Sequence, residues 1–233
     1  MADVRLVELT KHYRRGTEVI RALDGVTVDI EKGEFVAVVG RSGSGKTTML
    51  DLMGLLLKPT SGSLFIDGID TARLGDRERA HMRARRVGFV FQEYNLLSGL
   101  NVLENVMLPL RYVQNGKKTG AARAVELIDR VGLSDRIRHR PTELSGGQAQ
   151  RVAIARSMVN SPSLILLDEP TGAVDTETAQ QLVDLLKRLN REDKVTIVIV
   201  THDLDIAAQA NRNIRLKDGK VLADERVEAA GVA

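Results

Sequence analysis

The spacing of apolar positions divides the chain into a strand-rich first part, a helical middle and a mixed final part. Short apolar runs, separated by turn signals such as Lys32-Gly33 and Asp67-Gly68, predict strands at residues 4–9, 26–30, 35–39, 64–66 and 87–91. From residue 101 to residue 160 the spacing becomes helical, with Leu127, Ile128 and Val131 on one face and Asn101 and Ser134 as expected helix caps. A helical block therefore interrupts the sheet.

The final part predicts a β-α-β crossover. Residues 164–167 and 195–200 are continuous apolar runs, which are typical of parallel strands buried on both faces. The segment between them carries one apolar stripe at helical spacing, formed by Ala179, Leu182, Val183, Leu185, Leu186 and Leu189. The expected fold is therefore an α/β sheet with helices packed on it.

Composition narrows the function mainly by exclusion. The chain has 34 basic and 31 acidic residues, and a net charge of +3 is weak beside the basic face that nucleic-acid binding usually needs. The absence of cysteine excludes disulfides, thiolate metal sites and cysteine nucleophiles. The sequence begins MADVRLVELT, without the features of a secretory signal, and the apolar stretches have the length of strands. We therefore expect a cytosolic chain, no nucleic-acid partner, and a membrane role only through another protein.

Residues 40–47 read GRSGSGKT and match the phosphate-loop pattern G-x-x-x-x-G-K-[ST]. They follow the strand at residues 35–39 and precede a helix expected to end near residue 57, which is the context that the pattern requires. Glycines let successive N–H groups point inward as an anion nest at the helix N-terminus. Lys46 is expected to reach the β- and γ-phosphates, and the Thr47 hydroxyl to ligate Mg²⁺. The alternative is a simple Gly/Ser-rich turn, but a chance match in such a chain is on the order of 1%.

Two adjacent acids, Asp168 and Glu169, end the apolar strand at residues 164–167. An α/β sheet presents its ligand-binding side chains at this carboxyl edge. Because adjacent residues leaving a strand point in opposite directions, Asp168 is expected to face Mg²⁺ and Glu169 the attacking water. An isolated pair of acids is more often the start of a solvated turn. Because this chain also has a phosphate loop, the interpretation as a metal and water site is preferred here.

Residues 144–148 read LSGGQ, a match that arises by chance with probability on the order of 10⁻³ or less. Ser145 is expected to cap a helix whose first N–H groups, from Gly146 and Gly147, form a second anion site. The motif resembles the signature of the ATP-binding cassette (ABC) ATPases, and the resemblance covers essentially the whole chain. In that family the signature, here including Ser145, Gly146, Gly147 and Gln148, closes on the γ-phosphate held by the other protomer.

The remaining motifs of the family follow in order. Gln92, after the strand at residues 87–91, resembles the Q-loop residue, residues 171–175 (TGAVD) resemble the D-loop, and His202 resembles the switch histidine. Tyr13 lies where the family places an aromatic ring against adenine, although a lone tyrosine is also an ordinary packing residue. The resemblance implies catalytic roles for Glu169, His202, Gln92 and Lys46 and metal ligation through Thr47, Gln92 and Asp168. It implies ATP contacts from Tyr13, Gly40, Arg41, Ser42, Gly43, Ser44, Gly45, Lys46, Thr47 and Thr48.

The fold implied by the resemblance is the α/β P-loop NTPase fold of an ABC nucleotide-binding domain. It has a RecA-like core with an antiparallel β subdomain and an inserted helical subdomain. Here one domain spans residues 1–233, with the core at residues 1–92 and 161–233 and the helical subdomain at about 93–160. Two departures from the family pattern are Ala149, where glutamine is common, and Val174, where leucine is usual. Neither change removes a catalytic group.

The implied function is an ATPase that forms a homodimer around two ATP molecules with Mg²⁺ and drives a membrane permease. The permease is expected on a separate chain, with the ATPase on the cytoplasmic face of the membrane. Residues 89–110 and 168–175 are most similar to the lipoprotein-release and macrolide-export group. The cell-division group is close, so signalling without a transported substrate is the alternative. A DNA-repair or chromosome ATPase is disfavoured because no long coiled coil separates phosphate loop from signature. The substrate and the direction of transport are expected to depend on the permease.

Overall fold

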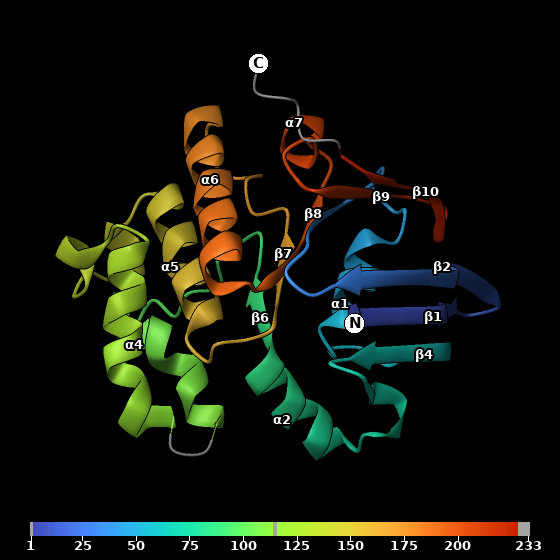
Figure 1. Cartoon of the computed structure of the whole chain (residues 1–233), viewed down its shortest axis with the longest axis horizontal. Helices are drawn as coiled ribbons and strands as arrows, with labels where there is room; N and C mark the ends of the chain where they lie inside the picture. Colours follow the sequence, from blue (N-terminus) through green and yellow to red (C-terminus); the bar gives the residue numbers. More distant parts are fainter. Residues whose placement is uncertain (1, 114–115, 228–233) are drawn as a thin grey trace.

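The computed structural model of the chain describes residues 2–113 and 116–227, which form two sheets and a helical block (Figure 1). The strands are β1 (Ala2–Arg15), β2 (Glu18–Glu31), β3 (Phe35–Val39), β4 (Ser61–Ile66), β5 (Ile69–Asp70), β6 (Val87–Val90), β7 (Leu164–Asp168), β8 (Thr196–Thr201), β9 (Arg212–Lys217) and β10 (Lys220–Arg226). The helices are α1 (Lys46–Met53), α2 (Asp76–Arg86), α3 (Val102–Met107), α4 (Gly116–Arg130), α5 (Gly146–Met158), α6 (Thr176–Asp193) and α7 (Leu204–Ala207). Short 3₁₀ turns occupy Thr71–Arg73, Leu108–Tyr112, Ser134–Arg136 and Pro141–Glu143.

The larger sheet has the order β10-β9-β3-β8-β7-β6, and its strands are parallel except for β10. Its central strands are buried on both faces, which explains their continuous apolar sequences. Along β7, successive side chains point to opposite faces of the sheet and pack into two different hydrophobic cores. Ile165 and Leu167 of β7 pack against the helical block, whereas Leu164 and Leu166 pack toward α1 and the smaller sheet. The predicted β-α-β crossover is confirmed, since β7 and β8 pair in parallel and α6 connects them.

The smaller sheet has the order β2-β1-β4-β5 and is antiparallel. Figure 1 shows this sheet on one side of the parallel strands and the helices α4, α5 and α6 on the other. Helix α1 lies between the two sheets and contributes Met49, Leu50, Leu52 and Met53 to their shared core. The phosphate loop at the start of α1 is therefore held by both sheets.

The helical block is organised around buried polar contacts as well as apolar packing. Asn101 caps α3 as predicted, because its side chain accepts a hydrogen bond from the Glu104 N–H. Asn105 is fully buried and binds the backbone of Leu97 and Leu100. The expectation that Ser134 caps a helix was wrong: it begins only a 3₁₀ turn, and its hydroxyl donates to the Asp129 carboxylate.

Several elements differ from the sequence prediction. Helix α1 ends at Met53 rather than near residue 57, because Leu55 adopts a positive φ of 57° and the Leu56 N–H turns back to the Asp51 carbonyl. Helix α2 and strands β9 and β10 were not predicted from the sequence. Across the described residues, no helix combines the length and apolarity needed to cross a membrane.

Candidate functional site

The phosphate loop connects β3 to α1 and has the backbone geometry of an anion nest. Gly43 and Gly45 have φ values of 79° and 103°, which residues with a Cβ rarely adopt. A Cβ on Gly45 would also collide with the Ala22 carbonyl of the neighbouring strand β2. Glycine is therefore required here for two reasons, and the loop is free to turn its N–H groups toward a ligand.

Polar groups under the loop fit a polyphosphate. The Lys46 ammonium group donates hydrogen bonds to the Gly40 and Arg41 carbonyls at 2.8 and 3.2 Å, which holds its charge beneath the curled backbone. The Ser44 hydroxyl is buried with no partner among the described residues. A buried cation, an unpaired hydroxyl and the N-terminus of α1 together make a site that favours phosphate oxygens.

Asp168, the acid expected to face the metal, lies at the end of β7 beside the first turn of α1. Burial, and then the nearby charges of Glu169 and Asp51, raise the pKa of the Asp168 carboxyl, whereas Lys46 and a hydrogen bond with Thr47 lower it. The Asp168 carboxyl and the Thr47 hydroxyl are therefore neighbouring oxygen donors. Such a pair fits Mg²⁺, which is usually held by one or two protein oxygens together with water and phosphate oxygens.

The second acid, Glu169, follows the last residue of β7. Its backbone has a φ of 44°, and its Oε1 lies 2.9 Å from Nδ1 of His202. The Glu169 side chain is 16% exposed and that of His202 is 73% exposed, so the pair faces the open side of the site. Gln92 lies nearby: a Cβ added to Gly172 would be 3.4 Å from both the Nε2 of Gln92 and the backbone carbonyl oxygen of Glu169.

Lys46, Thr47, Glu169, His202 and Gln92 line one cavity of about 760 Å³, whereas Asp168 is not among its lining residues. It is lined by Tyr13, Ile20, Arg21, Ala22, Arg41, Ser42, Gly43, Gly45, Lys46, Thr47, Thr48, Gln92, Glu169 and His202. Gly40 and Ser44 of the loop do not line this cavity but a second hollow, next to β9 and β10. The sequence analysis missed Ile20, Arg21 and Ala22, which come from β2. Ile20 pairs across the hairpin with Tyr13, so the two side chains form an exposed apolar surface suited to a flat base.

The signature segment lies outside this cavity, with Ser145 exposed and Gly147 buried. Ser145 caps α5 by accepting a hydrogen bond from the Gln148 N–H, as predicted. Asp175 caps α6, and α6 contributes Thr178, whose methyl group fills the space beside Gly147. None of residues 145–148 lines the cavity that holds Lys46 and Glu169 in the described chain. Each chain therefore presents a phosphate-binding cavity and a separate helix N-terminus.

The comparisons with known proteins agree with this geometry. The profile of the family described as "ABC transporter" matches residues 23–172. The chain belongs to the ABC transporter ATP-binding family. It is 47% identical over 228 residues to the uncharacterized ABC transporter ATP-binding protein MJ0796 of Methanocaldococcus jannaschii, covering 96% of this chain and 97% of that one. It is 46% identical to the macrolide export ATP-binding/permease protein MacB of Rhodopirellula baltica, covering 98% of this chain but only 34% of that longer protein.

A solved structure supports both the fold and the activity of this ABC ATPase. The structure of the MJ0796 cassette, described as a dimeric post-hydrolysis state bound to ADP and Pi, matches with a TM-score of 0.88 and 45% identity. The match covers 97% of this chain and 99% of that chain. The expected fold is thus confirmed, as is the expected ATPase activity, in which ATP and water give ADP and phosphate. The contacts of single residues with ATP or Mg²⁺ stay predictions.

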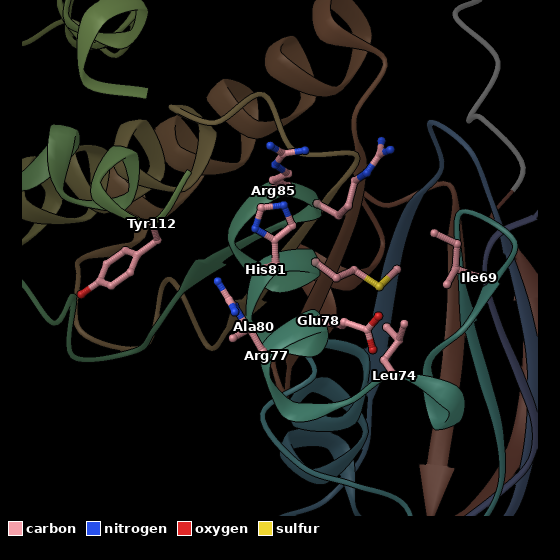
Figure 2. A pocket seen from close by; sticks show the side chains of 10 residues that line it. Ile69, Leu74, Arg77, Glu78, Ala80, His81, Arg85 and Tyr112 are labelled. Carbon is pink, nitrogen blue, oxygen red and sulfur yellow. The ribbon is translucent and has the colours of Figure 1, made fainter. Parts of the chain in front are cut away.

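Two neighbouring hollows of the ABC ATPase lie away from the phosphate loop, beside α2. Figure 2 shows the first, with Arg77, His81 and Arg85 on successive turns of α2, Tyr112 on one side and Ile69 and Leu74 on the other. The second, of about 520 Å³, shares Tyr112 and Ala80 with the first. It is otherwise lined by Leu56, Arg83, Ala84, Val87, Gly88, Phe89, Phe91, Asn95, Leu108, Pro109, Arg156, Ser157 and Asn160. The second hollow, which includes Phe91 and Asn95, therefore adjoins the loop that follows Gln92.

Proposed function

We propose that this ABC ATPase works as a homodimer in which two ATP molecules lie between the phosphate loop of one chain and the signature segment of the other. The observation that carries the proposal is the separation of these two anion-binding features within one chain. Lys46 and Glu169 share a cavity, whereas Ser145 and Gly147 lie outside it at the N-terminus of α5, where Ser145 is exposed. A second copy brings the missing donors to each γ-phosphate.

In the proposed site each side chain has a distinct task. Lys46 binds the β- and γ-phosphates, and Thr47, Asp168 and Gln92 hold Mg²⁺, which neutralises charge on the phosphate oxygens. Glu169 accepts a proton from the attacking water, and His202 orients Glu169 and contacts the γ-phosphate. Tyr13 stacks on the base. Most of the rate acceleration in this arrangement comes from positioning and electrostatic stabilisation.

The proposed output is movement of a membrane permease of the lipoprotein-release or macrolide-export type, encoded on a separate chain. The relatives named for macrolide export combine ATP-binding and permease functions by name, and this chain spans about a third of their length. MJ0796, by contrast, matches over 97% of its length. A separate permease places this ATPase at the cytoplasmic face of the membrane.

We further propose that the partner contacts the hollows beside α2. Tyr112 is 69% exposed and borders both hollows. Arg77, His81 and Arg85 offer positive charge to a partner segment with acidic side chains. Tyr112 also borders the hollow that includes Phe91 and Asn95, so movement of the loop after Gln92 reaches the partner at Tyr112.

Co-purification from detergent-solubilised membranes of the source cells tests this proposal. The tagged chain should retain an integral-membrane protein whose sequence includes an extracytoplasmic domain and a substrate path. Tyr112→Asp should lose this protein and retain ATPase activity in isolation. Leu222→Asp is the matched control, because Leu222 is 61% exposed on β10 and should leave the complex intact. Recovery of a protein that controls a cell-wall hydrolase would instead support the signalling alternative.

A further inference from the structure

The loop that follows β6 contains two consecutive residues in the left-handed region. Tyr94 and Asn95 have φ values of 57° and 49°, and neither is glycine. Two such residues in a row are disfavoured, because a Cβ crowds the backbone in this region. Strained backbone of this kind persists where the surrounding structure holds it in place.

The group that holds this turn is the guanidinium of Arg156, in the last turn of α5. Its Nη1 donates to the Asn95 carbonyl at 2.6 Å and its Nη2 to the Tyr94 carbonyl at 2.7 Å. Arg156 is 8% exposed, and it forms no ion pair with a carboxylate among the described residues. The two carbonyls are therefore its main polar partners, and the planar fork suits two adjacent acceptors.

The same loop also contacts the opposite end of α5. A Cβ on Gly146 of the signature would lie 2.8 Å from the Tyr94 hydroxyl. Gly146 and Arg156 are ten residues apart, or about 15 Å along a helix. The turn at Tyr94 thus contacts both ends of the signature helix, two residues after Gln92.

We propose that Arg156 is a positioning residue that fastens the Gln92 loop to the signature helix of its own chain and so couples the two ATP sites of the dimer. This inference rests on the proposed shared-site dimer. In that dimer Gln92 serves the ATP held by its own chain, whereas the signature at the start of α5 serves the ATP held by its partner. A rigid connection between loop and helix transmits the state of one site to the other.

The prediction concerns both the rate and the cooperativity of ATP hydrolysis. In Arg156→Lys, one ammonium group replaces the fork, so kcat should fall roughly 10-fold, as for other residues that orient a catalytic ligand. The affinity of the single chain for a fluorescent ATP analogue should stay unchanged. The Hill coefficient, which for two coupled sites lies between about 1 and 2, should fall toward 1.

Two further variants separate positioning from folding. Arg151→Lys is the matched control, because Arg151 lies on the same helix and also donates to a carbonyl, that of Val131, without touching the loop. It should keep the Hill coefficient of the parent. Asn95→Gly, combined with Arg156→Lys, should recover part of the lost rate, since glycine adopts the left-handed turn without the Arg156 fork.

Steady-state ATPase curves over a range of ATP concentrations decide the matter, with thermal unfolding as a check on each variant. A cooperative parent and an Arg156→Lys variant with unchanged Hill coefficient would overturn the coupling role while leaving the shared-site dimer intact. A parent with a Hill coefficient of 1 would overturn the shared-site proposal and this inference together. Reduced cooperativity in Arg156→Lys alone, with rescue by Asn95→Gly, is the expected result.

Discussion

A buried carboxyl near the N-terminus makes the stability of the fold depend on pH. Asp3 of β1 is 4% exposed, and its carboxylate accepts a hydrogen bond of 2.5 Å from the Thr196 hydroxyl at the start of β8. The Asp3 carboxyl also lies close to that of Asp67, which is paired with Arg86 at 3.2 Å. The hydrogen bond between Asp3 and Thr196 joins the two sheets, although the two residues are 193 positions apart in the sequence. Its protonation state therefore affects the whole core.

The size of the effect follows from the pKa. Burial, and then the hydrogen bond and charge of Asp67, raise the pKa of Asp3 from 3.8 to about 6, although Thr196 and Lys32 act in the opposite direction. The unfolded chain releases this proton at lower pH than the folded chain, so folding is penalised as the pH rises between these values. The penalty is about 1 kcal/mol at pH 4.5 and about 3 kcal/mol at pH 7.5.

Asp3→Asn tests this reasoning because an amide does not titrate and can both donate to Asp67 and accept from Thr196. The stability of the variant relative to the parent should increase by about 2 kcal/mol between pH 4.5 and pH 7.5, or roughly 4–8 °C in Tm for a chain of this size. Asp29→Asn, at an exposed position of β2, is the control and should show no such trend. A Tm difference between Asp3→Asn and the parent that is the same at both pH values would show that folding does not raise the pKa of Asp3.

Three predictions concern the nucleotide site. Lys46→Ala should weaken ATP binding roughly 10- to 100-fold in a fluorescent-nucleotide titration, because it removes a charged hydrogen-bond donor; unchanged affinity would reject the phosphate-loop assignment. Tyr13→Ala should weaken binding by roughly 10-fold by calorimetry and Tyr13→Phe should not, since stacking needs only the ring; equal losses would exclude stacking. Ser145→Arg should leave ATP binding to the single chain intact and block turnover, whereas loss of binding would contradict a role in trans. Gly147→Asp is less suitable because its Cβ would collide with Thr178.

The strands that surround the site were predictable because burial on both faces leaves a strong sequence signal. Leu164, Leu166, Val198 and Val200 enter one core and their neighbours the other, so residues 164–167 of β7 and 197–200 of β8 are all apolar. The phosphate loop was equally clear, because only glycine fits at residue 45. Here local sequence and tertiary environment impose the same requirement.

The missed elements had weaker or different signals. Helix α2 reads DRERAHMRARR and buries little apolar surface beyond Met82, so it carries no apolar stripe. The β9–β10 hairpin did have a signal, since Ile214 and Leu216 alternate with polar residues and Asp218-Gly219 is a favoured two-residue turn. The contacts of Arg156 with the Gln92 loop join segments about 60 residues apart, and no local pattern indicates them.

The proposed shared-site dimer is tested most directly by the association state of Glu169→Gln in ATP. Glutamine keeps the size and hydrogen bonding of Glu169 but cannot accept the proton, so phosphate release should fall by roughly 10²- to 10⁴-fold while ATP still binds. With turnover blocked, the ATP-bound dimer should accumulate by mass action. Size-exclusion chromatography with light scattering at saturating ATP should show a dimer for Glu169→Gln and mainly a monomer for the parent chain in ADP. A Glu169→Gln chain that binds ATP and stays monomeric would contradict the shared site.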